Sequence, residues 1–430
     1  MLQKINNPDK ADWENLCKRP SLSRSDLQQT VEQIFAEIKR NGNTAVKKYT
    51  GFFDNITIDN PKVSAVEIQQ SIKSVDQNLK NAIAAAKTNI EKFHLSQIEQ
   101  KKVIETSVGV NCWRESRPIE NVGIYIPGGS APLFSTVLML GIPARIAGCQ
   151  NVVLCTPPDK NGAINPAILY VAQLIGITEI YKIGGIQAIG AMALGTETVP
   201  KVDKIFGPGN QFVTAAKQEV MKYGVAIDLP AGPSEVLVVA DKTSNPEFIA
   251  ADLLSQAEHG ADSQVILLSD DASIIDLTIV ALINQLENLP RKETVIKAME
   301  HSKAILLNNL EDCIDFSNLY APEHLIIAAQ NDDYLGSKIS NAGSVFLGNY
   351  SCESAGDYAS GTNHTLPTNG YAKNYSGVSV DSFVKKITFQ KISAIGIQKI
   401  GPVIEILAEA EQLLAHKNAV TIRLKSLQND

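Results

Sequence analysis

The chain has 430 residues, of which 44% are hydrophobic and 20% are charged, and its 39 Lys and Arg residues against 46 Asp and Glu residues give a net charge of -7. This length is too great for one ordinary hydrophobic core and predicts two or more domains. The acidic balance, with no compensating basic cluster, argues against nucleic-acid binding as the main role.

The compartment can also be predicted from composition. The first ten residues lack the apolar core of a signal peptide, and no apolar run approaches the ~20 residues of a membrane span. The six cysteines are scattered without CxxC pairs, which indicates reduced thiols rather than a disulfide framework. We therefore expect a cytoplasmic protein.

Residues 1–102 are expected to form an N-terminal helical segment. Ser25 and Asp26 can cap a helix that runs to Arg40, where Asn-Gly-Asn ends it. A second helical stretch is predicted over 63–93. Between 103 and 120 two short β-like runs turn at Gly109, which predicts a hairpin leading into the first large domain.

A regular alternation of short apolar strands and helices follows. Strands are predicted at 122–126, 151–155, 179–183 and 204–206, and a helix follows each strand, the first over 131–147 and the second over 166–175. After a seam near residues 230–233 the alternation restarts, with strands at 234–240, 264–268, 304–307 and 344–347 and helices from Pro246 and over 273–289. This pattern is typical of right-handed βαβ units and predicts two consecutive α/β arrays with parallel sheets.

The chain ends in a different pattern. After Gly348 comes a long irregular stretch rich in glycine, and an irregular loop of that length inside a compact protein is usually functional. An amphipathic helix is predicted over 402–415.

One helix end suggests half of a metal site. Asn245 is a natural N-cap, Pro246 fits the first helical position, and Gly260 is a natural stop. Gln256 and His259 then share a face in the last turn, where the partial negative charge of the helix favours a cation. A solvated helix end would show the same pair.

Three glycine-rich turns follow strands of the first array, after Tyr125, Ile183 and Phe206. Glycines at the carboxyl ends of parallel strands let a ligand approach the backbone. None of the turns spells G-x-G-x-x-G, so both plain turns and a nucleotide cleft remain open at this stage.

Two further pairs place a carboxylate near an imidazole. Glu323 and His324 follow a proline and could serve as two acid/base groups, although a surface helix start would give the same dipeptide. Asp357 and His364 lie on the glycine-rich loop. Together with the helix-end pair they offer an oxygen and nitrogen ligand set without thiolates, which suits Zn²⁺ and also Mn²⁺ or Co²⁺.

His416 lies at the end of the last predicted helix. Glu411 precedes it by five residues, which is about 140° round a continuing helix. Periodicity alone would pair His416 with Gln412 or Glu409.

Six blocks of the sequence resemble the histidinol dehydrogenase family. They are YIPGGSAPLFSTV at 125–137, AGPSE at 231–235, SQAEHG at 255–260, APEHL at 321–325, the stretch from SAGDY to NHTLPT at 354–368, and AHKNAV at 415–420. The resemblance covers about residues 25–425.

This resemblance implies the oxidation of L-histidinol through the aldehyde to L-histidine with NAD, the last steps of histidine biosynthesis. It implies an α/β fold with two consecutive incomplete Rossmann-like parallel-sheet domains, at 103–232 on the NAD side and at 233–350. Small helical accessory segments would occupy 1–102 and 351–430, the latter including the active-site loop. The family forms a homodimer in which the C-terminal segment reaches the partner's site.

The resemblance also implies roles for individual residues. One zinc per subunit would be held by Gln256, His259, Asp357 and His416, the last across the dimer. Glu323 and His324 would be the catalytic acid/base pair. NAD would contact Tyr125, Gln187 and Asn210. The substrate would contact the zinc ligands and the catalytic pair together with Ser234, Tyr358, His364 and Glu411, so that the resemblance favours Glu411 over Glu409.

Other functions compete with this one. A related zinc and NAD dehydrogenase could act on another small alcohol, against which His364 and Glu411 argue. A zinc hydrolase could use Glu323 to activate water and would need no NAD. A binding module without catalysis would leave the acid/base pair without a role.

Overall fold

The computed structural model describes residues 2–20, 24–128, 132–230 and 232–428, without the side chains of 24–26. The chain divides into two compact units. The larger unit consists of Met1–Gln97 and Ile119–Phe383, and the smaller of Ile98–Pro118 and Val384–Asp430. Several residues named in the predictions lie outside the described part, namely Gly129, Ser130, Ala131 and Ala231, together with the side chains of Ser25 and Asp26.

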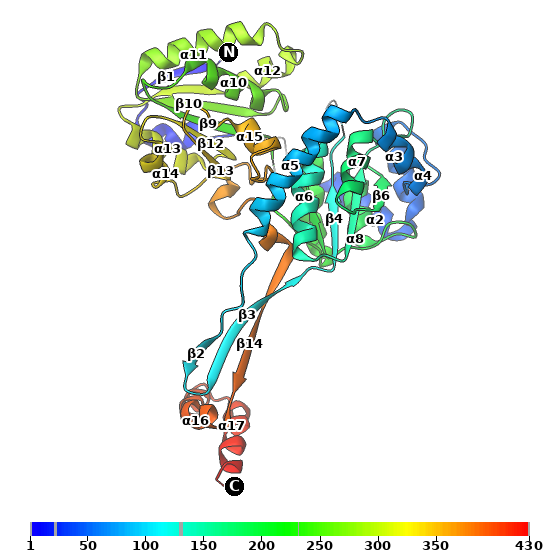
Figure 1. The fold of residues 1–430 in the computed structure, drawn as a ribbon, viewed down its shortest axis with the longest axis vertical. Helices are drawn as coiled ribbons and strands as arrows, with labels where there is room; N and C mark the ends of the chain where they lie inside the picture. Colours follow the sequence, from blue (N-terminus) through cyan, green and yellow to red (C-terminus); the bar gives the residue numbers. More distant parts are fainter. Residues whose placement is uncertain (1, 21–23, 129–131, 231, 429–430) are drawn as a thin grey trace. The chain divides into compact units, whose positions relative to one another are not determined.

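The first array forms a five-stranded parallel sheet in the larger unit (Figure 1). Its spatial order is β6-β5-β4-β7-β8, so the first strand of the array is central. The next two strands lie on one side of it and the last two on the other side. This is the order of the first five strands of a dinucleotide-binding fold. The strands are β4 (Asn121–Tyr125), β5 (Asn151–Thr156), β6 (Glu179–Lys182), β7 (Lys204–Phe206) and β8 (Ala226–Ile227).

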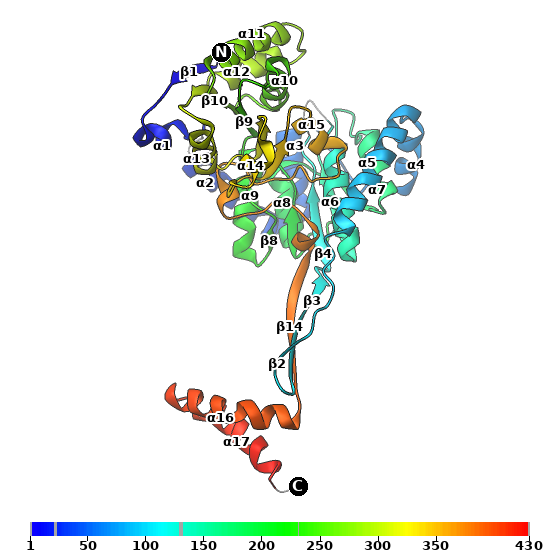
Figure 2. The ribbon, with the colours of Figure 1, turned by 60° about the vertical axis from the view of Figure 1, so that its left-hand side comes forward.

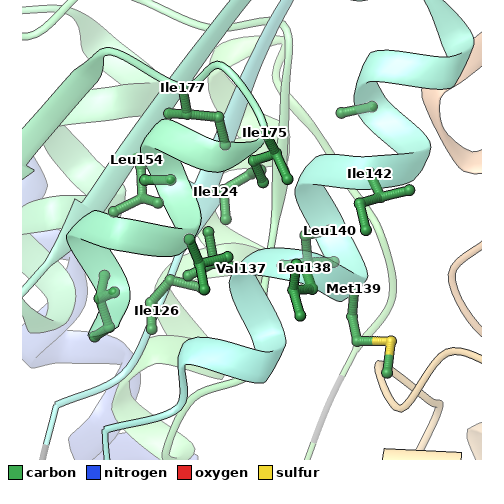
Figure 3. Close-up of a cluster of buried hydrophobic side chains, with 14 of the residues drawn as sticks. Ile124, Ile126, Val137, Leu138, Met139, Leu140, Ile142, Leu154, Ile175 and Ile177 are labelled. Atoms are coloured by element: carbon green, nitrogen blue, oxygen red, sulfur yellow. The ribbon is translucent and has the colours of Figure 1, made fainter. Parts of the chain in front are cut away.

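Helices cover both faces of this sheet. One face packs against α6 (Phe134–Ala147) and α7 (Pro166–Leu174), with α4 (Ala65–Lys73) and α5 (Gln77–Leu95) outside them. The other face packs against α8 (Gly185–Leu194) and α9 (Gln211–Val220), with α2 (Arg24–Asn41) and α3 (Asn43–Asp54). Figure 3 shows the first of these cores, where Ile124 and Leu154 of the sheet meet Val137 and Leu138 of α6. Because α6 is hydrophobic on nearly all sides, it is buried along most of its length.

The helical stretch predicted over 63–93 is confirmed, but it consists of two helices. The first ends at Lys73 with Ser74 as its C-cap, and Asp76 caps the second by accepting hydrogen bonds from the backbone N–H groups of Asn78 and Leu79. The predicted end of the preceding helix is confirmed, since α2 stops at Asn41 and Gly42 has a φ of +49°.

The second array forms a six-stranded parallel sheet with the order β1-β11-β10-β9-β12-β13. Its five strands β9 to β13 have the same spatial order as the five strands of the first sheet. The strands are β9 (Glu235–Ala240), β10 (Gln264–Ser269), β11 (Lys303–Leu306), β12 (His324–Ala328) and β13 (Ser344–Leu347). Two consecutive incomplete Rossmann-like sheets are thereby confirmed.

Two strands of this sheet were not predicted. β1 (Gln3–Asn6) comes from the N-terminal segment, and it is polar and exposed because it lies on the edge beside β11. β12 begins at His324, in the dipeptide that also suggested a helix start. Its residues are buried on both faces of the sheet, so the strand lacks the alternation of apolar and polar residues that would identify it in the sequence.

The helices of the second array also cover both faces. They are α10 (Pro246–Ala257), α11 (Ala272–Leu286), α12 (Lys292–Met299), α13 (Leu310–Tyr320) and α14 (Asp332–Gly336), with η1 (Lys10–Asp12) and α1 (Trp13–Leu16) from the N-terminal segment. Asn245 caps α10 as predicted, since its side chain accepts a hydrogen bond from the backbone N–H of Glu247 at 3.0 Å. The remaining stretch of the larger unit holds only α15 (Glu353–Tyr358), η3 (Tyr371–Lys373) and η4 (Val380–Phe383), while η2 (Met221–Tyr223) extends α9.

The smaller unit is a three-stranded antiparallel sheet followed by two helices. The predicted hairpin is confirmed as β2 (Ile104–Ser107) and β3 (Val110–Pro118), with Gly109 at a φ of +77°. The unpredicted strand β14 (Val384–Ile392) pairs with β3 over its length, as Figures 1 and 2 show. The helices are α16 (Ala394–Ala410) and α17 (Leu414–Ser426), which pack against each other.

The helix predicted over 402–415 is therefore wrong. Gln412, at a φ of +60°, interrupts the helical conformation between α16 and α17. Glu411 caps the end of α16 and His416 lies near the start of α17, so an angle measured round one continuing helix does not relate them. No helix in the described part of the chain is long and apolar enough to cross a membrane.

Candidate active site

The predicted catalytic residues lie at the amino-terminal edge of the second sheet. Glu235 is the first residue of β9 and His324 the first of the neighbouring strand β12, with Glu323 just before it. The last turn of α10 returns to the same edge and carries Gln256. Three segments that are distant in sequence thus meet at one place because parallel strands and their connecting helix share an edge.

The backbone of Glu235 connects these side chains. Its N–H donates to Glu323 Oε2 at 2.9 Å. Its carbonyl accepts from Gln256 Nε2 at 3.1 Å, and that amide also donates to Glu323 Oε2 at 3.2 Å. All of these groups are buried, so the orientation of the Glu323 carboxylate is fixed by two N–H donors.

The same contacts assign the tautomer of the His324 ring. Its Nδ1 lies 3.2 Å from both the carbonyl oxygen of Glu235 and Gln256 Nε2. Both hydrogens of the Gln256 amide are already used, so in the neutral ring Nδ1 carries the hydrogen and donates to the carbonyl. The Nε2 atom then has the free lone pair.

The carboxylates around His324 make its imidazole a stronger base. Burial lowers the pKa of His324, but the carboxylates of Glu323 and Asp357 outweigh burial and raise it well above its ordinary value. Burial likewise raises the pKa of Asp357, but the imidazoles around it, first that of His324, hold it below its usual range.

Several buried polar atoms at this edge have no hydrogen-bond partner. They include Gln256 Oε1, His324 Nε2 and Asp357 Oδ1, the last two being 3.4 Å apart without forming a hydrogen bond. An unpartnered buried polar atom typically costs about 1–3 kcal/mol, so three of them at one place mark a ligand site. Glu353 adds a fourth, Oε2, and burial raises its pKa to about 8.

His364 is held in place beside this cluster. Its Nδ1 lies 3.0 Å from the backbone oxygen of Asp357, and its Nε2 lies 3.1 Å from Thr136 Oγ1 on α6. These contacts fix the ring between the loop and the helix that follows β4.

Sequence reasoning missed the ion pair that fixes the start of β9. Arg19 Nε and Nη2 bind the two carboxylate oxygens of Glu235 at 2.6 and 3.0 Å, and the guanidinium lies 3.8 Å from the centre of the Tyr320 ring. The backbone N–H of Asn369 adds a hydrogen bond to Glu235 Oε1 at 2.8 Å. A charged first residue in an otherwise apolar, doubly buried strand was the available signal for Glu235, while nothing in the sequence singles out Arg19.

A second site lies at the carboxyl ends of the first sheet. It is a cavity of about 1130 Å³, and Tyr125, Gln187 and Asn210 all line it. Tyr125 Oη accepts a hydrogen bond from the backbone N–H of Gly185 at 3.0 Å. Gln187 is fully buried with Oε1 unpartnered, and Asn210 caps α9 from an exposed position.

One of the three glycine-rich turns has a purely structural reason. A Cβ on Gly207 would lie 2.1 Å from the carbonyl oxygen of Tyr125, and its φ is +126°. Only glycine lets the ends of β4 and β7 approach so closely.

Comparisons with known proteins decide the family. The histidinol dehydrogenase family model matches residues 17–424. A histidinol dehydrogenase of Bacteroides thetaiotaomicron is 55% identical and covers 100% of both chains, and one of Escherichia coli O157:H7 is 52% identical over 96% of this chain and 95% of its own. The crystal structure of histidinol dehydrogenase from Elizabethkingia anophelis is 64% identical, covers 99% of both chains and has a TM-score of 0.97.

The chain belongs to the histidinol dehydrogenase family. It is therefore an oxidoreductase of histidine biosynthesis that oxidises histidinol. An acetylating aldehyde dehydrogenase of Geobacillus thermoglucosidasius, 14% identical over 88% of this chain and 94% of its own with a TM-score of 0.50, shares the fold alone.

The structure brings together only part of the residue set that the histidinol dehydrogenase resemblance implies. Gln256, Glu323, His324, Asp357 and His364 form one connected group. Three more lie at its margins, namely Ser234 beside Glu235, the exposed His259 after α10, and the half-exposed Tyr358 at the end of α15. Glu411 and His416 are exposed in the smaller unit.

Removing Arg19 tests the dependence of this edge on its ion pair. Arg19→Met leaves the Glu235 carboxylate buried without its partner and should lower the free energy of unfolding by about 3–5 kcal/mol. Urea titration of Arg19→Met, Glu235→Leu and the double variant measures the coupling. The double variant should lose much less than the sum of the two single losses, and additive losses would show that the pair is not coupled.

Proposed function

We propose that this chain catalyses the NAD-dependent four-electron oxidation of L-histidinol, through L-histidinaldehyde, to L-histidine, with one zinc ion per subunit positioning the substrate. The observation that carries the proposal is the buried group in which unpartnered oxygen and nitrogen atoms adjoin the Glu323 carboxylate. The separate cavity at the other sheet provides room for a dinucleotide.

The residues of the larger unit fit a zinc ion in part. Gln256 Oε1 and Asp357 Oδ1 are buried oxygen atoms without a hydrogen-bond partner, and His259 lies just past the end of α10, three residues after Gln256. Among the described residues, no three His, Cys, Asp or Glu side chains gather closely enough to hold a metal by themselves. This agrees with a set in which one ligand is an amide and another, His416, comes from a partner subunit. When bound, zinc would supply a positive charge that anchors the substrate's imidazole and amine.

The cavity fits NAD through groups that are still free to bond. The Tyr125 hydroxyl accepts one hydrogen bond from Gly185 and keeps its own hydrogen to donate, and Gln187 Oε1 is a buried acceptor without a partner. NAD supplies the hydride acceptor in both oxidation steps, and the protein needs only to orient it and to move protons.

His324 is proposed as the base for the substrate hydroxyl. Its Nδ1 is held by the carbonyl of Glu235, which leaves Nε2 as the atom that takes the proton. The carboxylates of Glu323 and Asp357 stabilise the imidazolium that results.

Glu323 is proposed as the base for water. Oxidation of an aldehyde to an acid requires a water molecule to add to the carbonyl between the two hydride transfers. The hydrogen bonds from Glu235 N–H and Gln256 Nε2 hold the carboxylate in one orientation. A substrate anchored by its imidazole would bring the aldehyde carbon to both bases in turn.

Two alternatives are less well supported. A dehydrogenase for another small alcohol would not need His364, which is fixed at the edge of the group by Thr136 and the Asp357 backbone. A zinc hydrolase would have no use for the cavity, whose lining contains all three residues assigned to NAD.

A homodimer with shared sites is part of the proposal. The smaller unit exposes large apolar side chains on α16, α17 and between them, namely Ile395, Val403, Ile406, Leu407, Leu413, Leu414 and Ile422. An apolar surface of this kind is typical of a subunit interface. Glu411 and His416 lie exposed between and beside these residues, as expected for side chains that serve a partner's site. All six cysteines are free, which supports the proposed cytoplasmic location.

The division of labour between the two bases can be tested with the half-reactions. Glu323→Gln keeps the shape but removes the base, and such a loss typically costs ~10²–10⁴-fold in the step it serves. This variant should oxidise supplied L-histidinaldehyde far more poorly than it performs the first hydride transfer. His324→Ala should show the reverse, as measured by pre-steady-state NADH traces and aldehyde-fed assays.

A matched control is present in the chain. Glu300 and His301 form the same dipeptide at an exposed position, so Glu300→Gln and His301→Ala should leave both half-reactions unchanged. Equal losses in both half-reactions for both active-site variants would refute the division of labour.

Mixed dimers test the shared zinc site. His416→Ala and His259→Ala should each be inactive and zinc-poor. After subunit exchange, heterodimers contain one intact site, so activity and bound zinc should both return to about a quarter of the wild-type values. Elemental analysis gives a readout that is independent of activity.

The control pair is His259→Ala with Gln256→Ala. These two ligands are proposed to come from the same subunit, so mixing them leaves no intact site and should restore nothing. Recovery in this control, or none in the first mixture, would contradict a ligand donated across the dimer.

A further inference from the structure

The cavity at the first sheet contains a carboxylate that sequence analysis did not single out. Asp54 is the last residue of α3, and it lines the cavity together with Tyr125 and Gln187. Its Oδ2 accepts a hydrogen bond from Gln187 Nε2 at 3.3 Å. Asp54 therefore fixes the orientation of a fully buried amide whose Oε1 has no partner.

Asp54 lies beside the ends of two strands of the sheet. A Cβ on Gly184, the residue before α8, would be 2.6 Å from Pro157 Cβ and 3.4 Å from Asp54 Oδ1. Pro157 directly follows β5, so the carboxylate of Asp54 is next to the carboxyl end of the second strand of this array.

That place has a known use in dinucleotide-binding folds. An acidic side chain about 20 residues after the first glycine-rich turn binds the hydroxyls of the adenosine ribose there. Here β5 ends at Thr156 and is followed by two prolines, so the strand supplies no acid. The next acidic residue, Asp159, accepts hydrogen bonds from the backbone N–H groups of Asn161 and Ala163 at 2.8 and 2.9 Å and stabilises its own turn.

We propose that Asp54 binds the 2′- and 3′-hydroxyls of the adenosine ribose and thereby selects NAD against NADP. This inference rests on the proposed function, because it requires that the cavity binds the dinucleotide. An ionised carboxylate accepts hydrogen bonds from both hydroxyls, whereas a 2′-phosphate would bring a second negative charge against it. Among the described residues that line the cavity, Lys160 is the only cationic side chain, and it is exposed.

The contacts of the lining residues indicate how the dinucleotide is oriented. Asn210 lines the cavity and caps α9, whose first residue, Gln211, donates to Asp262 at 3.5 Å. Asp262 follows α10, the helix that carries Gln256. The nicotinamide half therefore belongs beside Asn210 and the adenosine half beside Asp54.

Calorimetric titration of the intact enzyme with NAD and with NADP tests the inference. Asp54→Asn keeps the shape and removes the charge, and a charge-assisted hydrogen bond typically carries a factor of about 10–100 in affinity. The variant should bind NAD about 10–100-fold more weakly and NADP no more weakly than the wild type, so the preference for NAD falls at least about tenfold. Asp159→Asn, the other lining carboxyl, should keep the wild-type preference.

The outcomes separate the two proposals. Wild-type enzyme that fails to bind NAD would overturn the proposed function and this inference with it. NAD binding with an unchanged preference in Asp54→Asn would overturn only the role of Asp54.

A second measurement uses wild-type enzyme and needs no folded variant. Adenosine 5′-monophosphate should compete with NAD at least about tenfold better than adenosine 2′,5′-bisphosphate, since the extra phosphate meets the carboxylate. Equal competition by the two nucleotides would refute the role of Asp54. Where the variant folds, binding of nicotinamide mononucleotide should be unchanged in Asp54→Asn, and an equal loss for both half-molecules would contradict the assignment to the adenosine ribose.

Discussion

The buried ion pair between Arg19 and Glu235 is the constraint on which the active-site edge depends. It fixes the first residue of β9, and the backbone of that residue then holds Glu323, His324 and Gln256 by hydrogen bonds of 2.9 to 3.2 Å. Because the backbone of a central strand cannot shift without disturbing its neighbours, the sheet holds the side chains at this edge rigidly. The cost of burying two charges is offset by a bidentate geometry, a backbone donor and an aromatic ring.

The two sheets have the same strand order but carry their functional residues at opposite ends. The first sheet has its cavity at the carboxyl ends, where parallel α/β sheets generally bind ligands. The second has the proposed acid/base pair at the amino ends of β9 and β12, where the last turn of α10 and the loop with Asp357 also arrive. Under the proposed function, the chain would use the first sheet to bind the cofactor and the second for the chemistry, and the three glycine-rich turns all follow strands of the first sheet.

The strand and helix alternation of both arrays was predictable from sequence because buried parallel strands are short apolar runs between clear helix signals. What failed did so for identifiable reasons. β1 is a polar edge strand, and only its pairing with β11 makes it a strand. Asp76 begins a second helix within a stretch whose sequence pattern looks continuous. Gln412 adopts a positive φ, which the residue type does not indicate. For the candidate site, the spacing of Gln256 and His259 and the Glu323–His324 dipeptide drew attention to segments that the structure brings together at one edge of the second sheet. Arg19, Glu235 and Asp54 were not found, because the partners of their side chains lie 133 or more residues away in sequence and only the folded chain brings them together.

The most direct test of the account is the stoichiometry of NADH formation with limiting substrate. Purified, zinc-loaded enzyme would be mixed with a known amount of L-histidinol and excess NAD, and absorbance at 340 nm would be followed to completion. The account predicts two NADH for each L-histidinol, with L-histidine as the product, because both bases lie at one buried edge and the aldehyde is oxidised there. One NADH per substrate with the aldehyde accumulating, or no NADH at all, would contradict it.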